Sequence, residues 1–414
     1  MSVTSLVPFV LLMTLFVVAG YFLCRKVSPY NSLVPELLRK KGYYQELESM
    51  RGILALSVVV HHAVVYYFLL YYQTPEISGR NATFYSQLGT APVTFFFFIT
   101  AFLFWSKLIA DPKPQPAKFM VARLRRLGPA YLGAALLMFS LVAVFSHFRL
   151  HESPVRVGVD ITRALLGETP QLNGLSYAPW LWGVTWTLQF EFLFYLLVPF
   201  LGWFAGSLRK SLLFIAGCNA LYAGTLVIDP AHWHLHGFFM FRALVRFLSF
   251  TFCIGFITAH LMRNERIRNF GRSKWAAPIS IALVLVALFF LPAQQGPLES
   301  IVLAIPFLAV AGGCDFWGVL RKRPLLFLGQ ISYSVYLIHC LLYGAILIPL
   351  YNVLGTEMRS PALFWAIVVV MAPFIVGMAT LWNHTFELPF MGRRTSAPRM
   401  VPISSNVPLQ SKPV

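Results

Sequence analysis

Residues 51–72 read RGILALSVVVHHAVVYYFLLYY, an apolar stretch that begins with one arginine and contains two adjacent histidines. The uncharged run from 52 to 72 is long enough to cross a bilayer as an α-helix, which takes about 20 residues. The histidines lie well inside that run, where ionisable side chains are costly and usually serve a function. The stretch therefore predicts a membrane helix that carries a functional group near its middle.

Similar apolar runs recur along the whole chain, which has 414 residues, of which 58% are hydrophobic and 12% charged. Such a composition excludes an ordinary soluble domain and predicts an all-α, polytopic transmembrane helical bundle. We expect about 11 spans, a 10-span core plus an extra N-terminal span. Because the run at 299–313 is short and could be re-entrant, ten is the alternative count. The runs lie at 4–24, 52–72, 86–107, 128–147, 181–204, 211–228, 239–262, 275–292, 299–313, 330–351 and 362–382.

Basic residues, lysine and arginine together, are concentrated in every second loop, as the positive-inside rule describes. The first run has no basic residue before it and is followed at once by Arg25 and Lys26, so we expect the N-terminus outside and the C-terminus in the cytoplasm. The net charge of +18 then reflects orientation, and no nucleic-acid partner is implied. The basic loops are 25–51, 108–127, 205–210, 263–274 and 314–325.

Three segments are expected from this pattern: an N-terminal anchor with a cytoplasmic linker over 1–47, a membrane domain over 48–392, and a disordered cytoplasmic tail over 393–414. The five cysteines are odd in number and show no paired spacing, so neither a disulfide framework nor a zinc site is indicated. The stretch DPAHWHLHG at 229–237 alternates three histidines, but as a short outer loop without a carboxylate cluster it predicts no metal site. We therefore expect no bound cofactor and no metal.

Arg51 and His62 are eleven residues apart, which is within ~20° of three whole helical turns, so both side chains share one face of the predicted helix. The rise per residue separates them by ~16 Å along the axis. If Arg51 marks the cytoplasmic edge, His62 lies near the middle of the bilayer. A snorkelling arginine needs no functional explanation, whereas a histidine at that depth usually faces a cavity.

Short motifs in a fixed order extend from residue 47 to residue 390. They are LESMRGILALSVVVHHA (47–63, in which ten residues separate the Arg from the second His), GTAPVTFFFFITAFLFW, KFMVARLRRLGPAYL, WTLQFEFLFYLLVPFL, FLGQISYSVYLIH and ELPF. This series resembles the acyltransferase-3 family, integral-membrane O-acyltransferases that modify cell-surface carbohydrates. The chain differs from the common pattern in having Thr100 and Ala101 where Ser-Gly is usual, and we expect an extra N-terminal span and no fused extracytoplasmic domain.

The resemblance implies roles for particular residues. His62 would be the catalytic base, with Glu191 at matching depth as its partner and Arg51 near the donor. Arg123 and Arg126, one helical turn apart, would bind the phosphates of acyl-CoA; without the family, a plain positive-inside cluster would be the preferred explanation. The substrate path would be lined by Trp186, Ser332, Tyr333, Tyr336 and His339.

The sequence thus predicts an O-acyltransferase that moves an acyl group, expected to be acetyl, from cytoplasmic acyl-CoA to a hydroxyl of a carbohydrate or glycolipid outside the inner membrane. His62 could act directly in a ternary complex, or an acyl group could rest on a protein residue between half-reactions. Aromatic residues near the end of the outer segment 148–180, namely Tyr177, Trp180 and Trp182, are candidates for acceptor contacts. A proton-coupled transporter is the alternative function, because it also uses intramembrane His, Arg and Glu.

Overall fold

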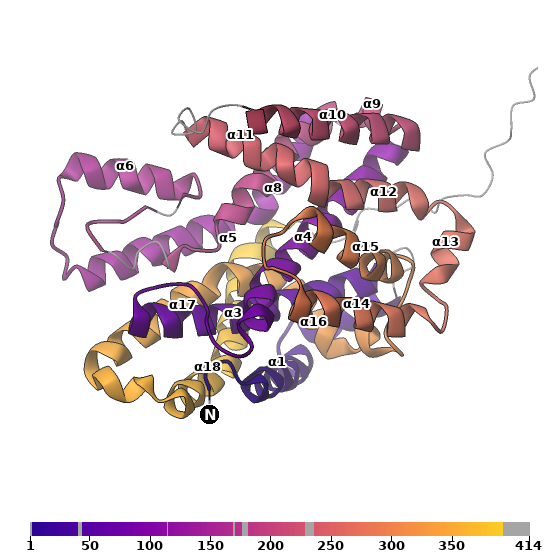
Figure 1. Cartoon of the computed structure of the whole chain (residues 1–414). Coiled ribbons are helices and arrows are strands. Elements are labelled where there is room, and N and C mark those ends of the chain that lie inside the picture. Colours follow the sequence, from indigo (N-terminus) through magenta and orange to yellow (C-terminus); the bar gives the residue numbers. More distant parts are fainter. Residues whose placement is uncertain are drawn as a thin grey trace, which may run out of the picture.

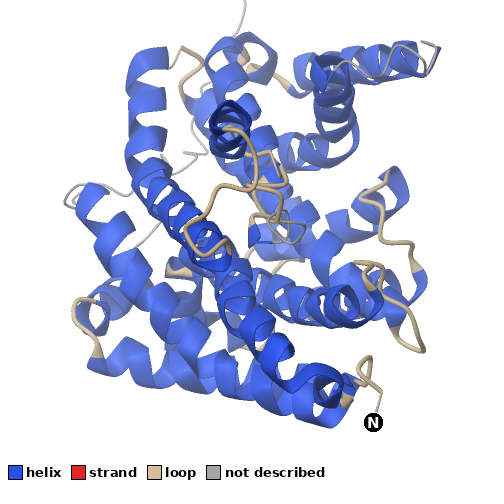
Figure 2. Ribbon diagram, turned by 90° about the vertical axis from the view of Figure 1, so that its left-hand side faces the viewer, coloured by secondary structure: helices blue, strands red, loops and turns tan. Residues whose placement is uncertain are grey.

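The computed structural model describes residues 2–39, 44–113, 115–168, 170–175, 181–227 and 236–391. Within these residues the regular secondary structure is entirely helical (Figures 1 and 2). The predicted all-α membrane bundle is therefore confirmed. The predicted tail at 393–414 lies outside the described residues.

Eight helical units are long and apolar enough to cross a membrane. Three further apolar helices are shorter, and together these eleven units coincide with the eleven predicted runs. The number of true crossings remains a prediction. The long units are α1 (Leu6–Lys26), α3 (Gln45–Tyr72), α4 (Ala82–Ala110), α5 (Pro116–Phe145), α10 (Leu208–Val227), α11 to α12 (His236–Phe247 and Cys253–Leu261, joined by the π-helical η3, Leu248–Phe252), α17 (Ser332–Leu354) and α18 (Pro361–Trp382); the short ones are α8 (Trp186–Leu197), α14 (Ala276–Phe290) and α15 (Pro297–Ala311).

Helix α3 lies at the centre of the bundle and is apolar around its whole circumference (Figure 1). It packs against α4 and α17, and against the short helix α16 (Arg323–Gln330). A helix that is hydrophobic on every face is stable only when protein or lipid covers all of it. By contrast, α1 leaves Val7 and Val10 more than 60% exposed, as expected of an outer helix that faces lipid.

The N-terminal segment is tied into the same bundle. Helix α1 packs along α16 and α18. The Trp365 indole on α18 donates a 3.0 Å hydrogen bond to the Val3 carbonyl, and the Tyr30 hydroxyl donates to Oδ1 of Asn383 at 2.7 Å. Residues that were predicted as an anchor and linker therefore contribute hydrogen-bonded contacts to the core of the structure.

An outer helix, α6 (Pro154–Leu165), extends beside α5 (Figure 1). The indole of Trp182, only 1% exposed, donates to the Ala164 carbonyl at 2.9 Å and holds α6 to the bundle. Trp182 therefore cannot stack on a sugar, and the expectation that it contacts the acceptor is wrong. Tyr177 and Trp180 lie outside the described residues.

The closest helix contact is made where α3 crosses α16. A Cβ atom added at Gly52 would lie 2.7 Å from the Gly329 backbone nitrogen, and one at Gly329 would lie 2.0 Å from the Glu48 carbonyl oxygen. Only glycine permits such an approach of two backbones. The contact sets the position of α3, and hence of Arg51 next to it.

We predict that Gly52→Ala lowers the unfolding free energy by about 1–3 kcal/mol, because the added methyl group must push two backbones apart. Thermal unfolding of the detergent-purified protein measures this. Gly217→Ala on α10 is the matched control, since nothing lies within 4 Å of its added Cβ and the protein should be unaffected or slightly stabilised. Equal melting temperatures for the two variants would contradict the close contact.

Candidate active site

A cavity of about 350 Å³, here called the basic pocket, opens among α3, α4, α5, α8 and α17. It brings together residues that are up to 292 positions apart in the sequence, from Tyr44 to Tyr336. Most of the predicted site residues line it: Arg51, Arg123, Arg126, Glu191, Ser332, Tyr333 and Tyr336.

The basic pocket carries more positive than negative charge. Its four cationic side chains, Arg51, Lys107, Arg123 and Arg126, face two carboxylates, Glu48 and Glu191. The Arg123 guanidinium lies 5.2 Å above the Phe104 ring, and its buried Nε has no hydrogen-bond partner among the described residues. A buried donor without a partner is costly, so this geometry favours an anionic ligand.

Arg51 is held at the pocket by a chain of polar contacts. Its Nη1 lies 3.6 Å from Oε2 of Glu48, and Oε1 of Glu48 accepts a 2.9 Å hydrogen bond from the Gln330 amide. The Asn383 amide in turn donates to the Gln330 carbonyl at 3.3 Å. These bonds run from α3 through α16 to the end of α18.

One wall of the basic pocket is apolar and comes from α4. Helical spacing places one face of α4 along the cavity, and Lys107 follows at its end. The wall consists of Val93, Phe96, Phe97, Ile99, Leu103 and Phe104. A ligand that is anionic at one end and apolar along its length therefore fits this cavity.

Tyr44 lies just before α3 and lines the same pocket. Burial raises the pKa of the Tyr44 phenol above its ordinary value, and nearby Arg268 opposes this shift only in part. The hydroxyl therefore stays protonated at neutral pH and can donate a hydrogen bond.

Glu191 does not pair with His62. One of its carboxylate oxygens accepts hydrogen bonds from the Thr100 hydroxyl at 3.0 Å and from the Tyr195 hydroxyl one helical turn away. These contacts keep the carboxylate on the basic pocket, so the predicted Glu191–His62 pair is wrong. The threonine that replaces the family's usual serine thus has a definite contact.

His62 is instead hydrogen-bonded to His339. Nε2 of His339 lies 3.1 Å from Nδ1 of His62, which is also 3.1 Å from the Val58 carbonyl oxygen. Nδ1 of His339 lies 2.9 Å from the Val335 carbonyl oxygen. Carbonyl oxygens only accept, so Nδ1 carries the proton in both neutral rings. Nε2 of His62 then carries a lone pair for which the described residues supply no hydrogen-bond donor, the form that a general base requires.

A second cavity of about 250 Å³, here called the histidine pocket, lies beyond His62. It is formed by the C-terminal half of α3, the loop that follows it and the start of α4. Its residues are His61, His62, Val65, Tyr66, Pro75, Glu76, Ile77, Ser86 and Gly183. Arg51 and His62 thus lie on different cavities, toward opposite ends of α3.

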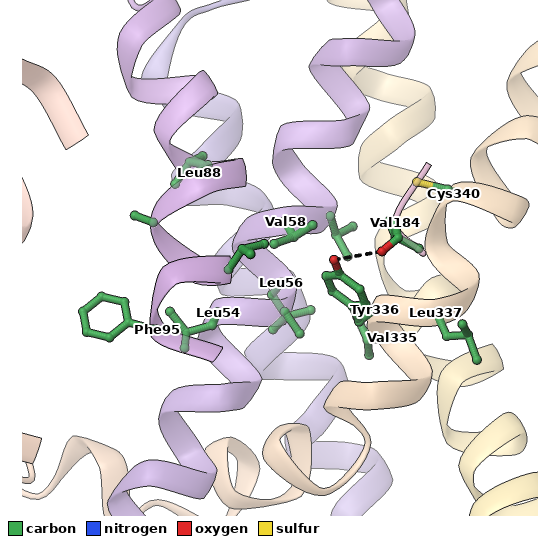
Figure 3. Close-up of a cluster of buried hydrophobic side chains, with 14 of the residues drawn as sticks. Leu54, Leu56, Val58, Leu88, Phe95, Val184, Val335, Tyr336, Leu337 and Cys340 are labelled. Atoms are coloured by element: carbon green, nitrogen blue, oxygen red, sulfur yellow. Dashed lines mark hydrogen bonds between the residues drawn. The ribbon is translucent and has the colours of Figure 1, made fainter. Parts of the chain in front are cut away.

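Tyr336 stands between the two pockets. Its hydroxyl donates to the Val184 carbonyl at 3.2 Å and shares a 2.8 Å hydrogen bond with the Thr187 hydroxyl. Figure 3 shows the ring directed toward Val184, with Val58 of α3 nearby. The centroid of the Tyr336 ring, which lines the basic pocket, is 6.1 Å from that of His339. A single side chain therefore separates the basic pocket from the histidine pair.

Trp186 lies elsewhere than predicted. At the start of α8 its ring packs against Phe190 and stacks on Phe247, and it lines neither pocket. His339 lines neither pocket either, because it is fully buried behind His62. The sequence did not point to Lys107 in the basic pocket or to Glu76 in the histidine pocket, since a basic or acidic residue at a helix end is usually only interfacial.

One set of described side chains could ligate a metal: His62, His339 and Cys340, whose donor atoms lie within 4.8 Å of one another. The direct hydrogen bond between the two rings already accounts for their separation, and no metal is needed for the arrangement. The histidines at 232 and 234 in the alternating stretch lie outside the described residues, and nothing is described of the side chain of His236.

The fold and the two pockets define a multi-pass membrane protein with a cationic cavity that meets a buried histidine. The model of an acyltransferase domain matches residues 44–382, and the chain belongs to the acyltransferase-3 family. It is therefore a membrane acyltransferase, which favours the enzyme over the transporter. Searches of curated proteins and of solved structures gave no match.

We predict that the two pockets are reached from opposite sides of the membrane. A cysteine at Leu103 in the basic pocket should react with a membrane-impermeant maleimide from the side of the basic loops. One at Ser86 in the histidine pocket should react from the other side. The five native cysteines are buried, so the wild type is the control. Labelling of both positions from one side of sealed vesicles would contradict the arrangement.

Proposed function

We propose that this chain is an acyl-CoA-dependent O-acyltransferase, with acetyl as the expected group, that acylates a hydroxyl of a glycan, glycolipid or exported saccharide outside the inner membrane. The observation that carries the proposal is the continuity of the site. The basic pocket, with its apolar wall, is lined by Tyr336, whose ring contacts His339, and His339 is hydrogen-bonded to His62 at the histidine pocket.

The donor fits the basic pocket. The phosphates of coenzyme A would meet Arg123, Arg126 and Lys107, whose charges and donors suit phosphate oxygens. The pantetheine arm would lie along the apolar wall of α4 and bring the thioester to Tyr336. Arg51, held by Glu48, would bind a phosphate or the thioester oxygen from the same side.

The acceptor fits the histidine pocket, where its hydroxyl would reach Nε2 of His62. In the direct reaction the acceptor oxygen attacks the thioester carbonyl carbon while Nε2 of His62 takes the hydroxyl proton. The C–S bond then breaks, and the coenzyme A thiolate leaves with the proton that His62 had taken, which returns the imidazole to its neutral form. Because Tyr336 lies between the pockets, its bond to Val184 must open for the acyl group to pass.

The same geometry accommodates an acyl-enzyme route, in which His62 would hold the acyl group between two half-reactions. In either route the basic loops face the cytoplasm, the source of acyl-CoA, and the histidine pocket faces the compartment of the acceptor. This orientation also places the N-terminus outside and the C-terminus in the cytoplasm.

We predict that His62→Ala lowers transfer by about 10²–10⁴-fold, the range of a lost general base, without loss of the protein from the membrane. The O-acyl content of surface glycans and glycolipids, measured by mass spectrometry in cells with matched membrane levels, reports the change. His384→Ala, an exposed histidine outside both pockets, is the control. If every O-acyl species persists in the His62 variant, His62 is not the base for those products.

We further predict that Arg126→Ala raises the KM for acetyl-CoA about 10- to 100-fold with little change in kcat, because one charge-assisted contact contributes ~1.5–3 kcal/mol. Initial rates of coenzyme A release in membranes measure both constants. Arg125→Ala is the matched control, since Arg125 is exposed and does not line the pocket. An equal KM in the two variants would remove Arg126 from donor binding.

A further inference from the structure

The partner of His62 is a second histidine rather than a carboxylate. Among the described residues, no carboxylate makes a hydrogen bond with either ring, whereas Nε2 of His339 lies 3.1 Å from Nδ1 of His62. From this geometry, and resting on the proposed function of His62, we infer that His339 is the positioning residue of the catalytic base. In many enzymes an Asp or Glu side chain orients the catalytic histidine, and here His339 takes that place.

The orientation of His339 is fixed from the side remote from His62. Its Nδ1–H donates to the Val335 carbonyl, one turn back in α17, and its ring is fully buried between Tyr336 and Tyr343, with centroid distances of 6.1 Å and 6.4 Å. The ring can therefore neither turn nor tautomerise without losing that bond. As a result, the lone pair of Nε2 stays aimed at His62.

The Val58 carbonyl is a second acceptor for the same proton, at the same distance of 3.1 Å. As residue i−4 of His62 in α3, it already accepts the backbone N–H of His62 in the helix. The lone pair on Nε2 of His339 has no second donor among the described residues, so it accepts from His62 alone. When Nε2 of His62 takes the acceptor proton, Nδ1–H becomes part of an imidazolium, and its bond to His339 becomes a stronger, charge-assisted bond.

A neutral partner suits this location better than a carboxylate. His339 is buried in an apolar bundle, where an additional ionised group would carry a large desolvation cost. A neutral imidazole accepts the bond without that cost in the resting state. The pair can then hold one positive charge during the reaction, with the added proton on His62 and the His339 lone pair directed at it.

The test compares His339→Gln with His339→Leu in membranes at matched protein levels, with acetyl-CoA as the donor and the native membrane acceptors. The glutamine amide oxygen can accept the bond from Nδ1 of His62, whereas leucine keeps a similar size without an acceptor. We expect His339→Leu to lower kcat about 100-fold with an unchanged donor KM, and His339→Gln to stay within about 10-fold of the wild type. His339→Asn, whose amide is too short to reach His62, should behave like the leucine variant and replaces it if leucine does not fold.

Cys340→Ala is the control, because it alters the next buried residue without touching the bond, and its kcat should match the wild type. A large loss of kcat in this variant would instead point to Cys340 as a third ligand of a metal held by the two histidines and would overturn the inference. Equal kcat in the Gln and Leu variants would also overturn it. The proposed function fails separately, if the wild type transfers no acyl group or if His62→Ala is fully active.

Discussion

The packing of α3 against α16 and α17 is the constraint on which the site depends. Glycines at 52 and 329 allow the backbones to approach closely, and the Gln330 amide then reaches Glu48 beside Arg51. Farther along α3, its packing against α17 brings His339 into hydrogen-bond range of His62. The position of α3 between α16 and α17 thus determines both the place of Arg51 at the basic pocket and the contact between the two histidines.

The helix itself supplies the distance between these two ends. Arg51 and His62 lie on one continuous α-helix, and their separation of ~16 Å along the axis follows from the helical rise. That length suits an extended donor that is bound by its charged end and reacts at its far end. In this conformation the Tyr336 hydroxyl is hydrogen-bonded to the Val184 carbonyl, and the Tyr336 side chain lies between the basic pocket and His339.

Much of the fold and part of the site could be predicted from the sequence. The positions of the helices follow from the apolar runs, because these depend on local composition. The distribution of basic residues among the loops likewise predicts an orientation of the chain in the membrane. Motif order also indicated Arg51, Arg123 and Arg126, which meet in one pocket. Depth along a span, however, is a one-dimensional quantity. Glu191 and His62 were matched by depth, but the rotation of α8 turns the carboxylate toward Thr100 and Tyr195.

Other features depend on contacts between segments that no local pattern encodes. Lys107 lines the basic pocket because the C-terminal end of α4 packs against the start of α5. At position 101 this chain has alanine where the family motif has glycine. Helices α4 and α12 nevertheless pack closely there, because a Cβ atom added at Gly255 on α12 would lie 2.5 Å from the Cβ of Ala101 on α4. The small residue is therefore supplied by the partner helix, which a reading of α4 alone could not show.

The most direct test of the account is transfer across the membrane. Radiolabelled acetyl-CoA would be added to the outside of sealed, inside-out vesicles from source-cell membranes, which expose the cytoplasmic face and enclose the acceptor. Label should appear in carbohydrate or glycolipid inside the vesicles, and His62→Ala should abolish it. Label that remains on coenzyme A, or that reaches the same acceptor equally well in the His62 variant, would contradict it.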